Sequence, residues 1–362
     1  MRTGIANLPL HDGKAPVWLF NMMTRLAREI AIIIVDEFGA VELMRKISDP
    51  FWLQAFGALM GFDWHSSGVT TTVCGALKEG LKGREAELGI FIAGGKGKAG
   101  IRTPQEILDR SKFIKGAPDS LIYASRMAAK VDSAGVQDGY QIYHHTFFFT
   151  PNQEWAVVQQ GMNPVTGYAR RYHWLTITPM DSFVDGPHTA ISATRVEKLV
   201  LNTVAKGYND NRSASTELAC QHPDKTITEF KKVQTLNLPA RHRILLQDIK
   251  PDHLYRTLTK IYEEQPDEFE TLMSLKGVGA KTIRALTLTS EIIYGKPTSF
   301  VDPARFAYAH GGKDGHPYPV ERENYEHTIA VLEQAIYRAK IGDHEKLSVL
   351  KRLSKINGKK SL

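Results

Sequence analysis

The feature that most restricts the fold of this 362-residue chain is a short glycine turn between two predicted helices. Apolar residues at helical spacing predict one helix over 268–276 and a second over 280–294. The glycines between them allow a positive φ and leave no side chain between the turn and a ligand. The second helix begins with unpaired N–H groups and the positive end of its dipole, which suits a phosphate oxygen. With Lys276 and Lys281 on either side, the turn predicts contact with a phosphate backbone.

Composition places the chain among ordinary globular proteins. It is 42% hydrophobic and 23% charged, and its 29 glycines and 17 prolines follow no repeat, which excludes collagen, coiled coils and global disorder. The length suggests two or three domains. The two cysteines, Cys74 and Cys220, are too few for a disulfide framework or a zinc knuckle and favour a reducing compartment.

Neither a membrane span nor a secretory signal is predicted. The most apolar stretch, residues 30–35, has charged residues on both sides and is much shorter than the roughly 20 residues that a bilayer requires. Near the start, His11, Asp12 and Lys14 interrupt the stretch where a signal peptide would continue its apolar run. We therefore expect a cytoplasmic protein without membrane contact.

Hydropathy patterns predict an α+β fold, in which N-terminal helices pack on a largely antiparallel sheet and an all-α domain follows. Helical spacing, for example of Trp18, Met22 and Leu26, covers residues 15–60, and the pattern becomes β between residues 88 and 177. Within that β region the predicted strands are 140–149, 155–162 and 169–176, the first two joined by a turn rich in turn-forming residues.

Helical patterning returns after residue 224, which suggests a division of the chain into parts. We predict an α+β catalytic domain over 1–205, a linker rich in Asn, Ser and Asp over 206–224, a helical DNA-binding domain over 225–340 and a basic tail over 341–362. From residue 338 onwards eight Lys or Arg oppose two acidic residues, so this end holds most of the +7 net charge. Such a tail is either a solvated terminus or an arm that attracts phosphate.

The segment 275–281 resembles the helix-hairpin-helix motif of DNA repair proteins, in which two glycines separated by an apolar residue precede a variable residue and a lysine. This resemblance implies sequence-independent DNA binding, because phosphates carry no base identity. It extends to the hairpin family of DNA glycosylases and glycosylase/lyases, where Gly-x-Pro-Thr and Val-Asp segments follow the hairpin, as at 295–298 and 301–302 here. By that resemblance Lys281 is the Schiff-base nucleophile and Asp302 the assisting carboxylate. The alternative is that Lys281 contacts phosphate and Asp302 caps a helix.

The β-rich half is dense in polar residues where core residues are expected. Carboxylates and imidazoles are ligands that Mg²⁺, Mn²⁺ and related ions use in phosphate hydrolysis. His144 and His145 are adjacent on one strand and point to opposite faces, so at most one of them faces a common site. His188 follows Pro187 and belongs to the same polar group of residues. The candidate metal ligands or water activators are Asp63, His65, Asp132, Asp138 and His144.

A second set of residues is predicted to contact DNA. The basic loop 94–98 lacks the spacing of a Walker motif and the Ser or Thr after its lysine, so a nucleotide site is not expected there. The predicted DNA contacts are Lys276, Gly277, Val278, Gly279, Lys281, Lys96, Lys98, Lys130 and Arg171.

Several longer segments, among them 62–72 (FDWHSSGVTTT), 89–98 (GIFIAGGKGK), 155–163 (WAVVQQGMN) and 169–174 (ARRYHW), resemble the prokaryotic domain-of-unknown-function family 763. The resemblance implies DNA processing and identifies no catalytic residue.

Together these features predict a metal-dependent DNA nuclease that uses Mg²⁺ or Mn²⁺ and contacts the DNA backbone without sequence preference. The alternatives are a DNA glycosylase/AP-lyase that uses Lys281 and Asp302, and a DNA-binding repair scaffold without activity. Whether the chain forms a homodimer is left open.

Overall fold

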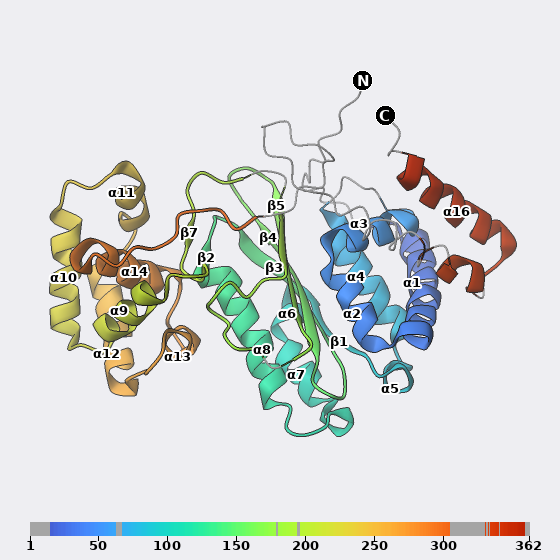
Figure 1. Ribbon diagram of the computed structural model, residues 1–362, viewed down its shortest axis with the longest axis horizontal. Helices are drawn as coiled ribbons and strands as arrows, with labels where there is room; N and C mark the ends of the chain where they lie inside the picture. The colour runs from blue at the N-terminus through green and yellow to red at the C-terminus, as the bar shows by residue number, and fades with distance from the viewer. Residues whose placement is uncertain are drawn as a thin grey trace.

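The computed structural model describes residues 15–62, 67–178, 180–193 and 196–304, together with most of 330–358. It has the predicted α+β class, with N-terminal helices packed on an antiparallel sheet. In Figure 1 the N-terminal helices lie on one side of the sheet, and α8 and the later helices α9–α14 lie on the other.

The N-terminal helices are amphipathic, and each buries one face. They are α1 (Val17–Phe38), α2 (Ala40–Ser48), α3 (Pro50–Leu59), α4 (Gly68–Leu81) and the short α5 (Glu85–Leu88). Along α1 the buried stripe begins at Met23 and continues through Leu26 and Ile30, whereas Trp18 and Met22 are exposed. The helix was therefore predicted correctly, and of the three residues that indicated its spacing only Leu26 is buried.

The central sheet has five strands in the order β1-β3-β4-β5-β6, and every neighbouring pair is antiparallel. The strands are β1 (Phe91–Lys96), β3 (Gln141–Phe149), β4 (Trp155–Met162), β5 (Ala169–Thr176) and β6 (Ala190–Ala193). The three strands predicted from turn chemistry and alternation agree with β3, β4 and β5 almost to the residue. Because successive side chains alternate, Phe148 and Val158 contact the N-terminal helices, while Phe147 and Val157 face α8.

The sequence pattern predicted β structure between residues 88 and 177, but part of this region is helical. Between β1 and β3 the chain forms α6 (Lys98–Ile101), α7 (Thr103–Leu108), η1 (Ser111–Phe113), α8 (Asp119–Lys130) and the π-helix η2 (Val131–Gly135). Helix α8 buries Leu121, Ala124 and Ala128 at helical spacing against the sheet. Because Ala124 and Ala128 are small, this face gives a weaker periodic signal than the aromatic strands beside it.

The predicted linker, residues 206–224, is structured. It contains α9 (Asn209–Ala219), which packs against α14 (Ala280–Tyr294). The Asn211 amide donates to the carbonyls of Thr287 and Lys296, and Ser215 is buried beside Ser290. Polar residues that look like a linker in the sequence are thus used for interhelical hydrogen bonds.

The remaining helices and the small sheet complete the second half. They are α10 (Pro223–Thr235), α11 (Ala240–Leu246), α12 (Pro251–Glu264), α13 (Phe269–Ser274) and the two-stranded pair β2 (Val136–Gln137) and β7 (Leu201–Asn202). One apolar cluster runs from the sheet residues Phe91 and Trp174 to Leu286 of α14. The sheet and these helices therefore share a core and are not separated by a linker.

The C-terminal residues do not form a free basic tail where they are described. Residues 343–358 form α16 (Asp343–Gly358), which packs against α3 and buries Val349 and Leu353 among the N-terminal helices. The segment 330–339, predicted as part of the DNA-binding domain, also packs there through Leu332 and Ile336. Among the described helices, none combines the length and the hydropathy needed to cross a membrane.

Candidate functional site

The glycine turn connects α13 to α14 and lies at the surface. Val278 is 1% exposed and anchors the turn in the shared core, whereas Lys276 and Gly277 on its outer side are exposed. Gly277 has a φ of 98°, a value that favours glycine over any L-residue. Because Val278 is buried and the glycines carry no side chain, the turn exposes its backbone to solvent at a fixed position.

The start of α14 has free hydrogen-bond donors. Gly279 is its N-cap residue, and no side chain caps the helix. Within the described residues, the N–H groups of Gly279 and Ala280 have no hydrogen-bond partner. A Cβ placed on either Gly277 or Gly279 would have no atom within 4 Å, so the space in front of both glycines is open. This geometry allows an anion to reach the backbone amides.

Two of the lysines predicted to contact DNA, Lys281 and Lys130, lie near the turn in different surroundings. Lys281 is largely exposed and is held by Asp248, with 3.1 Å between Nζ and Oδ2. Lys130, from the end of α8, lies next to the turn, since its Nζ is 3.4 Å from the carbonyl oxygen of Leu275. Partial burial lowers the pKa of Lys130. The structure therefore brings Lys130 to the turn, although it is 145 residues away in the sequence.

On the sheet, the α8 side carries a buried polar group that we call the Asp132 centre, comprising Asp132, Gln159, Trp174 and His188. The Asp132 carboxylate is fully buried and accepts hydrogen bonds from the Gln159 amide, from Trp174 Nε1 at 3.1 Å and from His188 Nε2 at 2.5 Å. The His188 ring lies 4.5 Å from the Trp174 ring and keeps a 9% exposed side chain. Its Nδ1 has no hydrogen-bond partner among the described residues.

The local backbone explains how Asp132 reaches this position. It belongs to the π-helix η2, which follows directly from α8; π-helical turns are rare and are frequently found at functional sites. Asp132 was predicted as a candidate ligand, but its contact with His188 was not predicted. His188 lies in the loop before β6. A pairing across 56 residues leaves no periodic signal in the sequence.

One arginine forms ion pairs with both Asp138 and Asp302. Arg170 contacts Asp138 at 2.8 Å and makes two hydrogen bonds to Asp302, at 2.9 and 2.7 Å. Asp138 also accepts from the Tyr172 hydroxyl at 2.7 Å. The Asp302 carboxylate further accepts from the backbone N–H groups of Glu197 and Ala304. The charge on both aspartates is therefore compensated inside the protein, and the described residues directly after Asp302 form no helix for it to cap.

His144 and Arg171 lie on the opposite face of the sheet, toward the N-terminal helices. His144 is 1% exposed and its Nε2 is 2.9 Å from the Thr146 hydroxyl. Burial, followed by the nearby charges of His145, Lys96 and Arg171, lowers the pKa of His144 to about 3. Arg171 is also 1% exposed and donates to Gln54 of α3 at 2.6 Å. Its burial removes Arg171 from any surface that could contact DNA.

The other predicted contacts and ligands are dispersed. Lys96, at the end of β1, and Lys98, at the start of α6, are exposed. Asp63 and His65 lie outside the described residues. Asp132, Asp138 and His144 belong to three separate polar groups, and the described part of the chain contains no cluster of three His, Cys, Asp or Glu side chains suited to a metal ion. Asp132, Asp138 and His144 therefore do not share one metal site.

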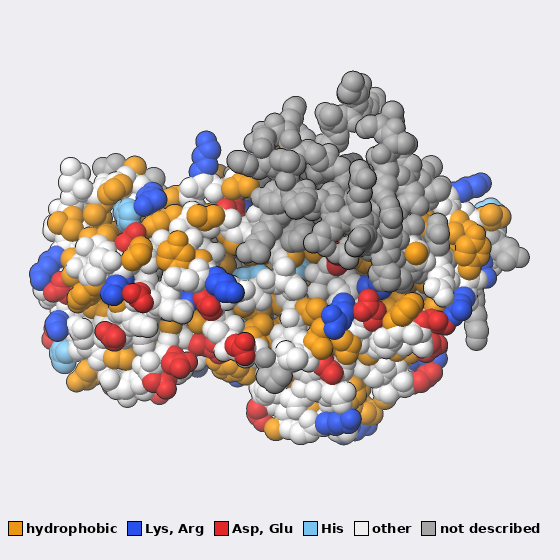
Figure 2. Space-filling model, in the orientation of Figure 1, with side chains coloured by type: hydrophobic (Ala, Val, Ile, Leu, Met, Phe, Trp, Pro, Cys, Tyr) orange, Lys and Arg blue, Asp and Glu red, His pale blue; other side chains and the backbone are white. Residues whose placement is uncertain are grey.

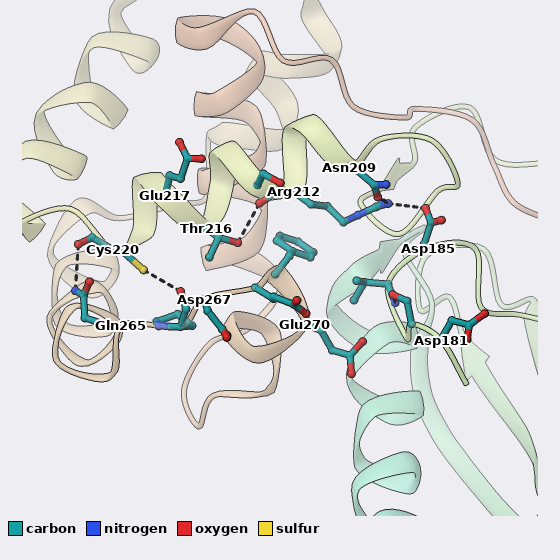
Figure 3. A pocket seen from close by; sticks show the side chains of 16 residues that line it. Asp181, Asp185, Asn209, Arg212, Thr216, Glu217, Cys220, Gln265, Asp267 and Glu270 are labelled. Carbon is teal, nitrogen blue, oxygen red and sulfur yellow. Dashed lines mark hydrogen bonds and ion pairs between the residues drawn. The ribbon is translucent and has the colours of Figure 1, made fainter. Parts of the chain in front are cut away.

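A second hollow has acidic walls and lies away from the turn. It has a volume of about 840 Å³ and lies between the loop 181–185, α9 and the turn 265–270. Figure 3 shows its carboxylates around Arg212, whose guanidinium is held by Asp185. The acidic residues that line it are Asp181, Asp185, Glu217, Asp267, Glu268 and Glu270. A wall of this sign repels phosphate.

On the face shown in Figure 2, basic and acidic side chains are interspersed. The distribution of charge on this face therefore does not indicate a nucleic-acid-binding surface. The glycine turn is therefore distinguished by its open backbone and its immediate neighbours, not by a broad basic patch.

Comparison with protein-family models matches residues 4–320 to the family described as "Protein of unknown function (DUF763)". The chain belongs to this family. The match includes the sheet, the Asp132 centre and the glycine turn. No curated protein and no solved structure matches the chain. Because the family description names no activity, a function has to be argued from the geometry of the sites.

Proposed function

We propose that this protein binds DNA through the sugar-phosphate backbone at the glycine turn between α13 and α14, as the helix-hairpin-helix resemblance implies. The observation that carries the proposal is the open backbone at Gly277 and Gly279, directly before an uncapped helix. Backbone N–H groups and the positive end of a helix dipole both favour a phosphate oxygen there. Contacts of this kind hold DNA in register without reading its sequence.

The surroundings of the turn support a rigid site. Val278 holds the turn in the core, and the Gln137 side chain donates to the Ala280 carbonyl at 2.9 Å. Because the amides are already positioned before DNA arrives, little conformational entropy is lost on binding. Lys276 and Lys130, whose Nζ contacts the carbonyl of the preceding Leu275, add positive charge at the α13 end of the turn.

The test is a substitution that blocks the amides without straining the fold. Gly279 has a φ of −127° and open space around its Cα, so Gly279→Val fits the folded backbone. We expect this variant to bind labelled duplex DNA about tenfold more weakly for all sequences, since it loses charge-assisted hydrogen bonds. The matched control is Gly342→Val, another glycine with open space directly before a helix, at the other end of the chain. Equal binding by both variants would remove the turn from the mechanism.

Phosphodiester hydrolysis is a second candidate function, and the Asp132 centre is the observation that favours it. Asp132 holds His188 through Nε2–H, which leaves Nδ1 as the proton acceptor. His188 Nδ1 would take a proton from a water molecule, and the resulting hydroxide would attack the phosphorus and form the new P–O bond. The bond to the leaving oxygen would break, and solvent would protonate that oxygen. The positive charge that develops on the imidazole would be stabilised by the buried Asp132 carboxylate.

His188→Asn and Asp132→Asn test this candidate. Each is expected to lower cleavage of single-stranded and bubbled DNA by at least about 100-fold, the usual contribution of a general base. His242→Asn is the control, because His242 forms a similarly buried pair with Glu291 at 3.0 Å in the helical half. If His188→Asn cleaves DNA as fast as His242→Asn, the pair has a structural role only.

The requirement for Mg²⁺ or Mn²⁺ stays a prediction, which cleavage assays with EDTA would check. The glycosylase/AP-lyase alternative has less support, because Lys281 is paired with Asp248 and Asp302 with Arg170. Borohydride trapping on abasic DNA would reveal a Schiff base at Lys281. A scaffold without activity would bind DNA and fail in both assays.

A further inference from the structure

A basic hollow lies beside the glycine turn. It has a volume of about 350 Å³ and is lined by Gly277 and by four side chains of α12, which are His253, Arg256, Thr257 and Lys260. Residues spaced by three, four and seven positions lie on one face of a helix. Since Gly277 lines the same hollow, this face of α12 is directed at the turn.

The cations in the hollow are available for a ligand. Arg256 and Lys260 are exposed, and within the described residues neither has a carboxylate partner. Arg256 Nη2 donates to His253 Nδ1 at 2.6 Å, which orients the guanidinium and leaves its other N–H groups free to donate. Glu264 lies one turn beyond Lys260 on the same helix, but it does not line the hollow.

Asp248, which contacts the first turns of α14, is already neutralised. Asp248 contacts Lys281 at 3.1 Å and Arg284 at 2.6 Å, so two cations oppose one carboxylate. The residues that line the hollow include Arg256 and Lys260 and no carboxylate. A ligand for the hollow has to be anionic and narrow enough to approach Gly277.

We infer that this hollow binds a phosphate of the DNA backbone, next to the phosphate contacted by the start of α14. The inference rests on the proposed function, and it extends the DNA contact from α14 to α12. Arg256 offers a planar fork to phosphate oxygens, Lys260 a point charge and Thr257 a hydroxyl. The absence of a Cβ at Gly277 lets the ligand approach the turn.

The experiment measures the affinity of the full chain for labelled duplex DNA of random sequence over a series of NaCl concentrations. Arg256→Gln and Lys260→Gln each remove one exposed charge, so both variants should fold, which circular dichroism checks. Each is expected to weaken binding about three- to tenfold and to reduce the slope of log K against log salt by about 1. The matched control is Lys82→Gln, an exposed charge at the end of α4, on the opposite side of the sheet in Figure 1. It should change neither quantity.

The outcomes separate the two proposals. Unchanged affinity and slope in both Arg256→Gln and Lys260→Gln, with Gly279→Val still impaired, would overturn the inference and leave the proposed function standing. Unchanged binding in all three variants would overturn both. An equal loss in Lys82→Gln would show that only net charge matters, which also contradicts a site in the hollow.

Discussion

Arg170 and Asp302 form a bidentate ion pair with completely buried side chains, although they are 132 residues apart in the sequence. Arg170 belongs to β5, and Asp302 lies shortly after α14. The pair ties the central sheet to the chain that follows α14. It also explains why a carboxylate that resembles a catalytic residue in the sequence has its charge compensated inside the protein.

Loss of Arg170 should destabilise the protein more than loss of Asp302. Arg170→Met leaves Asp138 and Asp302 as buried charges without their partner, whereas Asp302→Asn leaves Arg170 paired with Asp138. Removing one partner of a buried pair costs about 3–5 kcal/mol, and we expect Arg170→Met at the upper end of that range. Urea unfolding gives both values. A larger loss for Asp302→Asn would contradict this ranking.

Buried histidines should make the fold sensitive to acid. Burial lowers the pKa of His144 to about 3 and also lowers the pKa of His145 and His173, whereas unfolded histidines titrate near 6.5. As the pH falls below about 6.5, these histidines become protonated in the unfolded chain but stay neutral in the native state. The free energy of unfolding therefore decreases by about 1.4 kcal/mol per pH unit for each histidine that remains neutral in the fold. The loss attributed to His144 ends near pH 3, where the folded state also becomes protonated.

The pH dependence can be assigned with two variants. Urea midpoints at neutral and mildly acidic pH should show a smaller acid effect in His144→Asn than in the unmodified protein. His253→Asn, which changes an exposed histidine of α12, should show the full effect. A pH profile that His144→Asn leaves unaltered would show that this imidazole is not the group that titrates.

Gly57 should be required for the contact between α3 and α4. A Cβ at this position would lie 2.2 Å from Val69 Cγ2, so Gly57→Ala forces the helices apart at a cost of about 1–3 kcal/mol. Adding Val69→Ala should restore part of that stability. Gly75→Ala in α4 is the control, because its Cβ would meet Phe20 at an ordinary 3.6 Å and should be neutral or slightly stabilising. Thermal unfolding distinguishes these effects.

The C-terminal helix α16 should contribute to the core of the N-terminal helices. Leu353 is 1% exposed and Leu347 is 58% exposed on the same helix. Leu353→Ala is therefore expected to cost about 2–5 kcal/mol of unfolding free energy, and Leu347→Ala less than about 0.5 kcal/mol. Similar losses for the two variants in chemical denaturation would mean that α16 does not pack as described.

Local patterns in the sequence predicted elements whose signals are short-ranged. Alternation and turn residues located β3, β4 and β5, and the apolar positions on each side of Gly277 and Gly279 located α13 and α14. They failed for α8, whose buried face includes the small residues Ala124, Ser125 and Ala128, and for α9, whose buried face is mostly polar. The helix α14, which packs against α9, lies far away in the chain.

The sequence by itself determined the strands, the glycine turn and the presence of carboxylates and imidazoles in the sheet half, because each depends on neighbouring residues and their backbone preferences. Only the tertiary structure decided the partners of those groups: His188 for Asp132, Arg170 for Asp302, and α12 for the turn. Distant segments come together because the sheet and the helices bury their apolar faces against one another. The local sequence pattern does not indicate which polar groups this burial brings into contact.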